Sequence, residues 1–292
     1  MRAGFIGLGA MGRTMAERLI SQGVGLTVWN RTPSKAEGLG ADVASCPAEV
    51  FEREEVVILN LFDSEAVSDV LTGEDGFLSC EADLSGSLVI DTSTNHHRSV
   101  GLFSEIVAGS GAEYLEAPVL GSVMPAREGR LTALAGGSRA AYERALHYLD
   151  KLASTVFHLE DVGAAARMKL VNNLVLATYM AGLAEALVLA EDSGISREGA
   201  LEILGAGAAQ GLVFNAKRQK LLNDDYSTHF SSEAIYKDLH YAQDLAREIG
   251  RPLFTAGAVK ELYAMAMAGG IGAEDFSALV KVFRSFSPEA DA

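Results

Sequence analysis

The sequence has 292 residues, 49% of them hydrophobic and 22% charged, which predicts a folded protein of two domains that each bury a core. With 24 Lys and Arg against 39 Asp and Glu, the net charge is -15, so the overall field repels nucleic acid and anionic membrane surfaces. Cys46 and Cys80 are too few for a disulfide framework and lack metal-ligand spacing, which favours a reducing cytoplasm and no metal site.

The first half of the chain alternates strand and helix patterns. Short continuous apolar runs predict strands at residues 3–6, 26–29, 56–59 and 88–90. Helical spacing predicts helices between them at residues 11–20, 64–71 and 99–108. The pattern continues with strands at 114–117, 131–134 and 155–157 and a helix at 139–149. Runs that are apolar on both faces and separated by helices predict a parallel sheet covered on both sides.

From Ala164 onward only helical periods occur. Helices are expected at 164–191, 197–204, 214–221, 232–249, 252–268 and 274–283. The fold class is therefore α/β, with an N-terminal Rossmann-type doubly wound sheet and a C-terminal all-helical domain joined by a long helix. The expected boundary divides the chain into residues 1–162 and 163–292.

One stretch of the second half resembles a transmembrane helix in its length and apolar composition. Residues 174–190 are nearly all apolar, but Asn172 and Asn173 precede them and Glu185 interrupts them. These polar residues favour a buried helix of a soluble protein over a transmembrane helix. The start of the sequence lacks the apolar region and cleavage site of a signal peptide, so we expect a cytoplasmic protein without membrane contact.

A glycine-rich turn lies between the first strand and the first helix. The motif G-x-G-x-x-G comprises Gly7, Leu8, Gly9, Ala10, Met11 and Gly12. In this position the first glycine permits a tight turn, the second lets backbone N–H groups approach a pyrophosphate, and the third lets helix and strand pack closely. The motif predicts a dinucleotide site.

The end of the second strand indicates which dinucleotide is bound. An NAD site usually has Asp or Glu there for the adenosine ribose, whereas this sequence has Asn30, Arg31 and Thr32. A carboxylate repels a 2'-phosphate and an arginine can hold one. NADP(H) is therefore the expected cofactor, against the alternative that Arg31 is an ordinary surface charge.

Lys169 and Asn173 lie at the head of the long helix, four residues apart and so on one helix face. A lysine beside an apolar helix is either an end residue that extends to water or a partly buried acid or base. The residues alone leave both interpretations open.

Several motifs together resemble the β-hydroxyacid dehydrogenase family, which includes 3-hydroxyisobutyrate dehydrogenases and glyoxylate/succinic semialdehyde reductases. They are, in matching order, residues 7–12, 91–94, 117–119 with Gly121 and Ser122, Gly163 with Lys169 and Asn173, and residues 237–239. Asn30 to Thr32 is most similar to the NADPH-using reductase branch.

The resemblance implies a role for each matching residue. Lys169 corresponds to the family's catalytic lysine and Asn173 to its helix partner. Residues implied at the cofactor are Leu61, Thr94 and Lys237, in addition to the glycine turn and residues 30–32. Residues implied at the substrate are Thr94, Gly121, Ser122, Phe230 and Asp238. Residues 1–162 would then bind NADP(H), and residues 163–292 would bind the substrate. Independently of the resemblance, the helix at 174–190 is apolar around most of its circumference, so we expect the helical domains to form the interface of a homodimer or homotetramer.

The implied reaction is hydride transfer between NADP(H) and a small carboxylate-bearing aldehyde, 2-oxo acid or β-hydroxy acid. Leu120 stands where the family usually has a serine, which leaves the substrate open. The alternatives are a 3-hydroxyisobutyrate dehydrogenase, an imine reductase, in which the lysine is usually replaced, or a non-catalytic interaction module with a dinucleotide fold.

Overall fold

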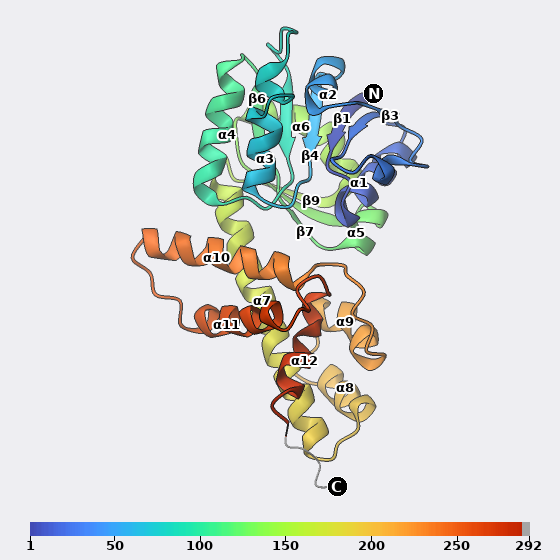
Figure 1. The fold of residues 1–292 in the computed structure, drawn as a ribbon, viewed down its shortest axis with the longest axis vertical. Helices are drawn as coiled ribbons and strands as arrows, with labels where there is room; N and C mark the ends of the chain where they lie inside the picture. Colours follow the sequence, from blue (N-terminus) through green and yellow to red (C-terminus); the bar gives the residue numbers. More distant parts are fainter. Residues whose placement is uncertain (288–292) are drawn as a thin grey trace. The chain divides into compact units, whose positions relative to one another are not determined.

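The computed structural model describes residues 1–287 and divides into two compact units. The sheet unit comprises Met1–Lys169, and the helical unit begins at Leu170. Helix α7 (Ala164–Asp192) contributes to both as one continuous element, seen in yellow-green in Figure 1. The expected boundary after residue 162 remains a prediction.

Six parallel strands form the main sheet. They are β1 (Arg2–Ile6), β2 (Gly25–Trp29), β3 (Asp42–Val43), β4 (Val56–Leu59), β5 (Leu88–Asp91) and β6 (Glu113–Glu116). Their spatial order is β3-β2-β1-β4-β5-β6, so the order reverses between β1 and β4. In doubly wound sheets, ligands bind outside the carboxyl ends of the strands at such a reversal.

Helices cover both faces of this sheet, as the apolar runs predicted. Alternate strand residues point to opposite faces: Phe5 and Ile58 belong to one apolar cluster, and Ile6 and Leu59 to the other. The first cluster includes residues of α1 (Ala10–Ser21) and α6 (Arg139–Leu152). The second includes residues of α2 (Pro47–Arg53), α3 (Ser64–Thr72) and α4 (His97–Gly109). The Rossmann-type architecture is confirmed.

The later strands form a second sheet instead of extending the first. It contains β7 (Val119–Leu120), β8 (Leu131–Ala135) and β9 (Ala153–His158), with β7 and β8 antiparallel and β8 and β9 parallel. Pro118 separates β6 from β7, and a proline cannot donate to a strand ladder. The short helix α5 (Val123–Glu128) then connects β7 to β8.

The helical unit has one apolar core, to which every one of its described α-helices contributes. Besides α7 these are α8 (Arg197–Ala206), α9 (Leu212–Leu222), α10 (Ser232–Glu248), α11 (Phe254–Ala268) and α12 (Leu279–Arg284). Serine side chains cap two of them: Ser196 accepts from the Gly199 amide and Ser231 from the Ala234 amide. The prediction of an all-helical second half is confirmed.

Helix α7 is long and apolar enough to cross a membrane by length and composition, yet 44% of the apolar window lies buried inside the protein. Ala177, Met180 and Leu187 are buried in the core of the helical unit. On the opposite side of the helix, Val175 and Leu189 are 62% and 66% exposed.

Candidate active site

The three glycines of the turn after β1 face different surroundings. A Cβ atom at Gly7, where φ is +101°, would lie 2.2 Å from the Asn60 carbonyl oxygen, and one at Gly12 would lie 2.0 Å from the Gly7 carbonyl oxygen. A Cβ at Gly9 would meet nothing within 4 Å. Packing therefore requires the first and third glycines, while the second faces open space that a ligand can approach.

The start of α1 offers backbone donors beside that space. Gly9 is the N-terminal cap, and no described side chain caps the helix. The N–H groups of a first helical turn have no partner within the helix, so they are available to an anion. The amide of Leu8 is not, because it donates to Asn30 Oδ1 at 2.7 Å.

Asn30 and Arg31 at the end of β2 have distinct environments. Asn30 is bound on both sides of its amide group, since Nδ2 also donates to the Thr32 carbonyl oxygen at 3.0 Å. Arg31 is exposed and has no hydrogen bond or ion pair with any described residue. Its guanidinium is available to a phosphate.

A second cation follows on the same turn and was not assigned by sequence analysis. Lys35 is exposed, and its backbone carbonyl accepts from Arg13 Nη1 of α1 at 2.6 Å. This bond holds the turn η1 (Pro33–Ala36) against α1. The signal that could have revealed Lys35 is the spacing of two cations four residues apart after a strand that ends without a carboxylate.

The segments after β4 and β5 hold each other at the carboxyl edge of the sheet. The Leu61 amide donates to Ser93 Oγ at 2.9 Å, and the Leu61 side chain packs against Gly7. Thr94 is half-buried in the same segment. Asp91, which is fully buried, accepts from the Ser93 amide at 2.9 Å, and burial raises the pKa of its carboxyl group.

Lys169 lies in the sheet unit, next to the strand that leads to Gly121 and Ser122. Its side chain is buried, with 8% of the residue exposed, and Nζ donates to the Val119 carbonyl oxygen at 2.8 Å. Lys169 therefore does not extend into solvent. Gly121 has a φ of +124°, and Ser122 precedes α5 without capping it through its hydroxyl group.

Asn173, one helical turn after Lys169, is enclosed by polar partners within the helical unit. Its Nδ2 donates to Asp238 Oδ2 at 2.6 Å, and its Oδ1 accepts from Asn172 Nδ2 at 3.0 Å. Lys237 forms an ion pair with Asp238 Oδ1 at 2.9 Å. Asp238 thus fixes the amide of Asn173, and both residues are 1% exposed.

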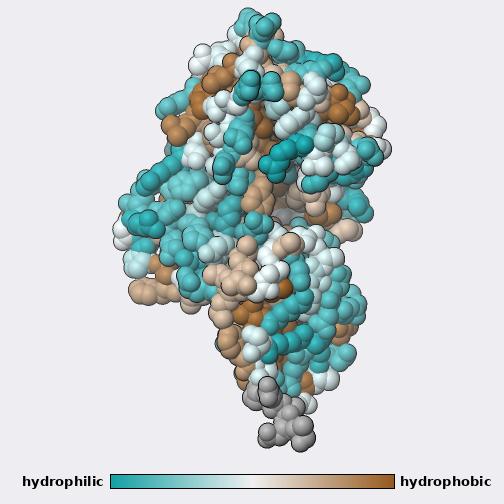
Figure 2. Space-filling view, viewed as in Figure 1, coloured by the Kyte–Doolittle hydropathy of each residue, from teal (hydrophilic) through white to brown (hydrophobic). Residues whose placement is uncertain are grey.

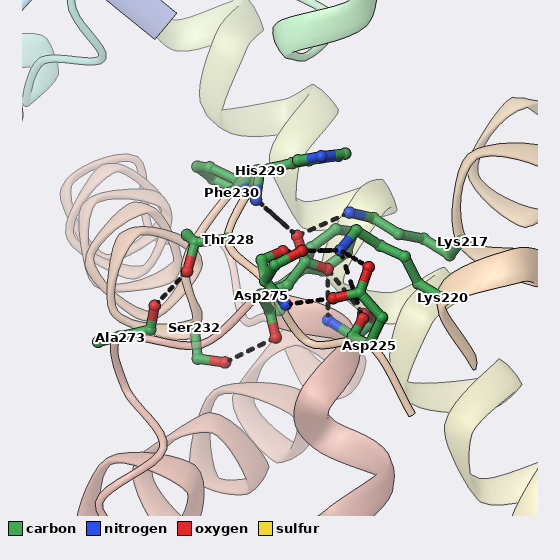
Figure 3. Close-up of polar contacts among 12 residues, drawn as sticks. Lys217, Lys220, Asp225, Thr228, His229, Phe230, Ser232, Ala273 and Asp275 are labelled. Carbon is green, nitrogen blue, oxygen red and sulfur yellow. Dashed lines mark hydrogen bonds and ion pairs between the residues drawn. The ribbon is translucent and has the colours of Figure 1, made fainter. Parts of the chain in front are cut away.

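A buried ion pair fixes the loop that carries Phe230 (Figure 3). Asp275 Oδ2 accepts from Lys217 Nζ at 2.8 Å and from the amides of His229 and Phe230 at 3.1 and 3.3 Å. Burial lowers the pKa of Lys217. Burial also disfavours the charged form of Asp275, but the Lys217 ammonium outweighs this effect and holds the pKa of the carboxyl group below its usual value. Sequence analysis did not identify this pair, because its members are 58 residues apart without a local motif.

Comparison with known proteins relates this architecture to a family. Residues 2–160 match the family model for the NAD binding domain of 6-phosphogluconate dehydrogenase. Residues 163–283 match the model for the NAD-binding region of NADP-dependent 3-hydroxyisobutyrate dehydrogenase. The chain is 36% identical to glyoxylate/succinic semialdehyde reductase 1 of Arabidopsis thaliana over 99% of its own length and all of the relative's.

The chain belongs to the β-hydroxyacid dehydrogenase family. This β-hydroxyacid dehydrogenase is also 36% identical to glyoxylate/succinic semialdehyde reductase 2 of the same plant, described as chloroplastic, over 97% of this chain and 79% of the relative. Among solved structures it is similar to the 3-hydroxyisobutyrate dehydrogenase of Salmonella typhimurium. That similarity has a TM-score of 0.88 at 27% identity and covers 97% of this chain and 99% of that one.

Membership confirms the resemblance drawn from the motifs. This β-hydroxyacid dehydrogenase is an NAD(P)-dependent oxidoreductase. The cofactor also fits the residues present, because Gly9 faces open space, α1 begins without a described side-chain cap and Arg31 is an exposed cation.

Proposed function

We propose that this β-hydroxyacid dehydrogenase is an NADPH-dependent reductase of small aldehydes or 2-oxo acids that carry a carboxylate, of the glyoxylate/succinic semialdehyde type. The observation that carries the proposal is the buried amine of Lys169, bound to the carbonyl oxygen of Val119 at 2.8 Å, directly before Leu120 and Gly121. A buried ammonium next to a chain segment that offers hydrogen-bond donors can polarise and protonate the oxygen of a bound carbonyl compound.

The preference for NADPH rests on the end of β2. No carboxylate stands at residues 30–32, and the exposed Arg31 can form charge-assisted hydrogen bonds with a 2'-phosphate. Thr32 and Lys35 are exposed nearby in the sequence and can add donors. The first-turn amides of α1 would hold the pyrophosphate.

Lys169 acts in this proposal as the general acid of the reduction. The bound nicotinamide supplies the hydride, and the protein must orient the carbonyl group and deliver a proton to its oxygen. The ammonium of Lys169 polarises that oxygen and protonates it as negative charge develops. Val119 directs the amine, and Asn173, held by Asp238, lies on the same helix face one turn away. In the oxidative direction Lys169 accepts the proton.

The substrate carboxylate is assigned to Gly121 and Ser122. The Ser122 hydroxyl does not cap α5, so it remains available as a donor, and Gly121 exposes its backbone. The side chain of Leu120 cannot donate a hydrogen bond, so fewer side-chain donors serve the carboxylate than in relatives with a serine there. Thr94 and Leu61 at the cofactor, Lys237 at the cofactor, and Phe230 and Asp238 at the substrate remain predictions.

We further propose a cytoplasmic homodimer or homotetramer in which a second copy covers the exposed side of α7. Apolar or small residues with helical spacing form a stripe along it, namely Val171, Val175, Gly182 and Leu189. Water-exposed apolar stripes of this kind are typical of interfaces. Apolar residues also interrupt the hydrophilic surface of the helical unit in Figure 2.

A panel of substrates tests the proposed activity. NADPH oxidation is followed with glyoxylate, succinic semialdehyde, methylmalonate semialdehyde and tartronate semialdehyde, and NADP⁺ reduction with 3-hydroxyisobutyrate. The match of the second half to 3-hydroxyisobutyrate dehydrogenases favours that oxidation as the second candidate function. Absence of turnover with every compound would overturn the proposed reaction class.

A further inference from the structure

Glu116, the last residue of β6, contacts the beginning of α7. Its Oε1 accepts from the Ala165 amide at 3.1 Å and its Oε2 from the Ala166 amide at 2.9 Å. A carboxylate at the first turn of a helix satisfies unpaired N–H groups and interacts favourably with the helix dipole. Glu116 therefore serves as the cap of α7 from a distant part of the chain.

The surroundings of this carboxylate leave it little freedom. Glu116 is 1% exposed, and its backbone exchanges hydrogen bonds of 3.1 and 2.9 Å with Gly136. A Cβ atom at Gly136 would lie 2.3 Å from Glu116 Oε1. Any side chain at residue 136 would thus push the carboxylate away from the helix.

The strand segment that follows Glu116 and the start of α7 form a second contact at Lys169. Val119 follows Glu116 by three residues, and Lys169 follows Ala165 by four, about one turn of helix. The bond from Lys169 Nζ to the Val119 carbonyl and the bonds from the α7 amides to Glu116 therefore clamp one strand segment to one helical turn at two points. Sliding or rotating the helix start would break both contacts.

The carboxylate has no ion-pair partner among the described residues, and its charged neighbour Asp91 has the same sign. Burial raises the pKa of Glu116 to about 7 even though three backbone amides, including that of Gly163, oppose the rise. Burying a carboxyl group without a cation is unfavourable, so its contribution is the geometry that it imposes.

We propose that Glu116 is a positioning residue for Lys169, holding the first turn of α7 so that the amine points to the Val119 carbonyl and the reacting oxygen. This inference rests on the proposed role of Lys169 as general acid. We assign Glu116 no contact with substrate or cofactor, because its carboxylate is buried against the α7 amides.

Kinetics of single and double variants test the inference. Glu116→Gln keeps one acceptor oxygen and turns the other into a donor that opposes a backbone N–H. We expect kcat to fall about tenfold or more with a less than twofold change in KM for NADPH. Glu113→Gln, on the same strand but partly exposed and paired with Arg144, is the control and should leave kcat unchanged. In the Lys169→Ala background, Glu116→Gln should lower kcat no further, since both act through one group.

A structural readout separates this inference from the proposed function. Labelling of the Lys169 amine by acetic anhydride, measured by peptide mass spectrometry, should be several-fold faster in Glu116→Gln and in Glu116→Asp than in the wild type or in Glu113→Gln. Equal labelling rates, or an equal loss of kcat in the presence and absence of Lys169, would overturn the positioning role. Full turnover by Lys169→Ala would overturn the proposed function, and the labelling would still decide whether Glu116 holds the amine.

Discussion

The side-chain oxygen of Asn30 accepts a hydrogen bond from the Leu8 amide at 2.7 Å, which ties the end of β2 to the glycine turn after β1. Because Asn30 also donates to the Thr32 carbonyl, its amide group shapes the turn. Arg31, between them in the sequence, stays exposed. Asn30 thus shapes the end of β2, and Arg31 leaves an exposed cation beside it.

This division predicts different cofactor effects. Arg31→Ala should raise KM for NADPH roughly tenfold to a hundredfold, which corresponds to the loss of one charge-assisted hydrogen bond. KM for NADH should stay nearly unchanged. Asn30→Ala should weaken both cofactors, because it loosens the glycine turn. Steady-state kinetics with each cofactor measure the two ratios. Equal losses with NADPH and NADH in Arg31→Ala would contradict the assignment.

Removal of the Lys169 amine should affect chemistry and spare cofactor binding. Lys169→Ala is expected to lower turnover by about 10²- to 10⁴-fold, the range for loss of a positioned proton donor. Lys169→Arg should also be slow, since a guanidinium stays protonated and cannot alternate between acid and base. NADPH fluorescence titration serves as the control for binding. Wild-type turnover by the Ala variant at saturating substrate would exclude the mechanism.

The exposed stripe on α7 leads to an expectation about assembly. Light scattering of the wild type at micromolar concentration should report a dimer or tetramer, and Val175→Glu should lower the mass because it places a charge in the interface. Leu102→Glu provides the control: Leu102 is 59% exposed on α4 and should tolerate the charge. A monomeric wild type, or equal masses for Val175→Glu and wild type, would argue against this interface.

The buried carboxyl group of Glu116 makes stability depend on pH. Its pKa is about 7 in the folded protein and near 4.5 when unfolded, so between these values the unfolded chain binds fewer protons than the folded one. The free energy of unfolding should therefore fall as pH rises from about 4.5 to 7, by about 3 kcal/mol at most. Urea unfolding at several pH values measures this slope. It should be shallower in Glu116→Gln, and parallel profiles would count against the assignment.

The Lys217–Asp275 pair should matter far more for stability than an exposed pair. Lys217→Met leaves the fully buried carboxylate of Asp275 without its cation and should cost about 3–5 kcal/mol. Lys281→Met removes a partly exposed partner of Glu274 and should cost less than about 1 kcal/mol. Urea unfolding compares the two, and similar losses would show that the buried pair does not hold the Phe230 loop.

Local patterns in the amino-acid sequence predicted the alternation of strands and helices, the glycine turn and the family. Each is encoded in a short window: the periodicity of apolar residues within one element, or glycines placed where a Cβ has no room. Arg31 was assigned in the same way, because a strand end without a carboxylate is visible locally. The expected helices of the second half agree with the structure to within two residues at each end, except that the last begins at Leu279 instead of near residue 274.

The burial of charged and polar groups depends on contacts between segments that are distant in the sequence. Whether the Lys169 side chain extends to water or is buried depends on Val119, which lies 50 residues earlier in the sequence. The contact between Glu116 and the α7 amides has a similar separation in sequence. The second sheet likewise depended on where the chain turns after Pro118. Such contacts have no periodic signal, because a buried charge is stabilised by whichever donors the fold brings to it, and those come from segments that are far apart in the sequence.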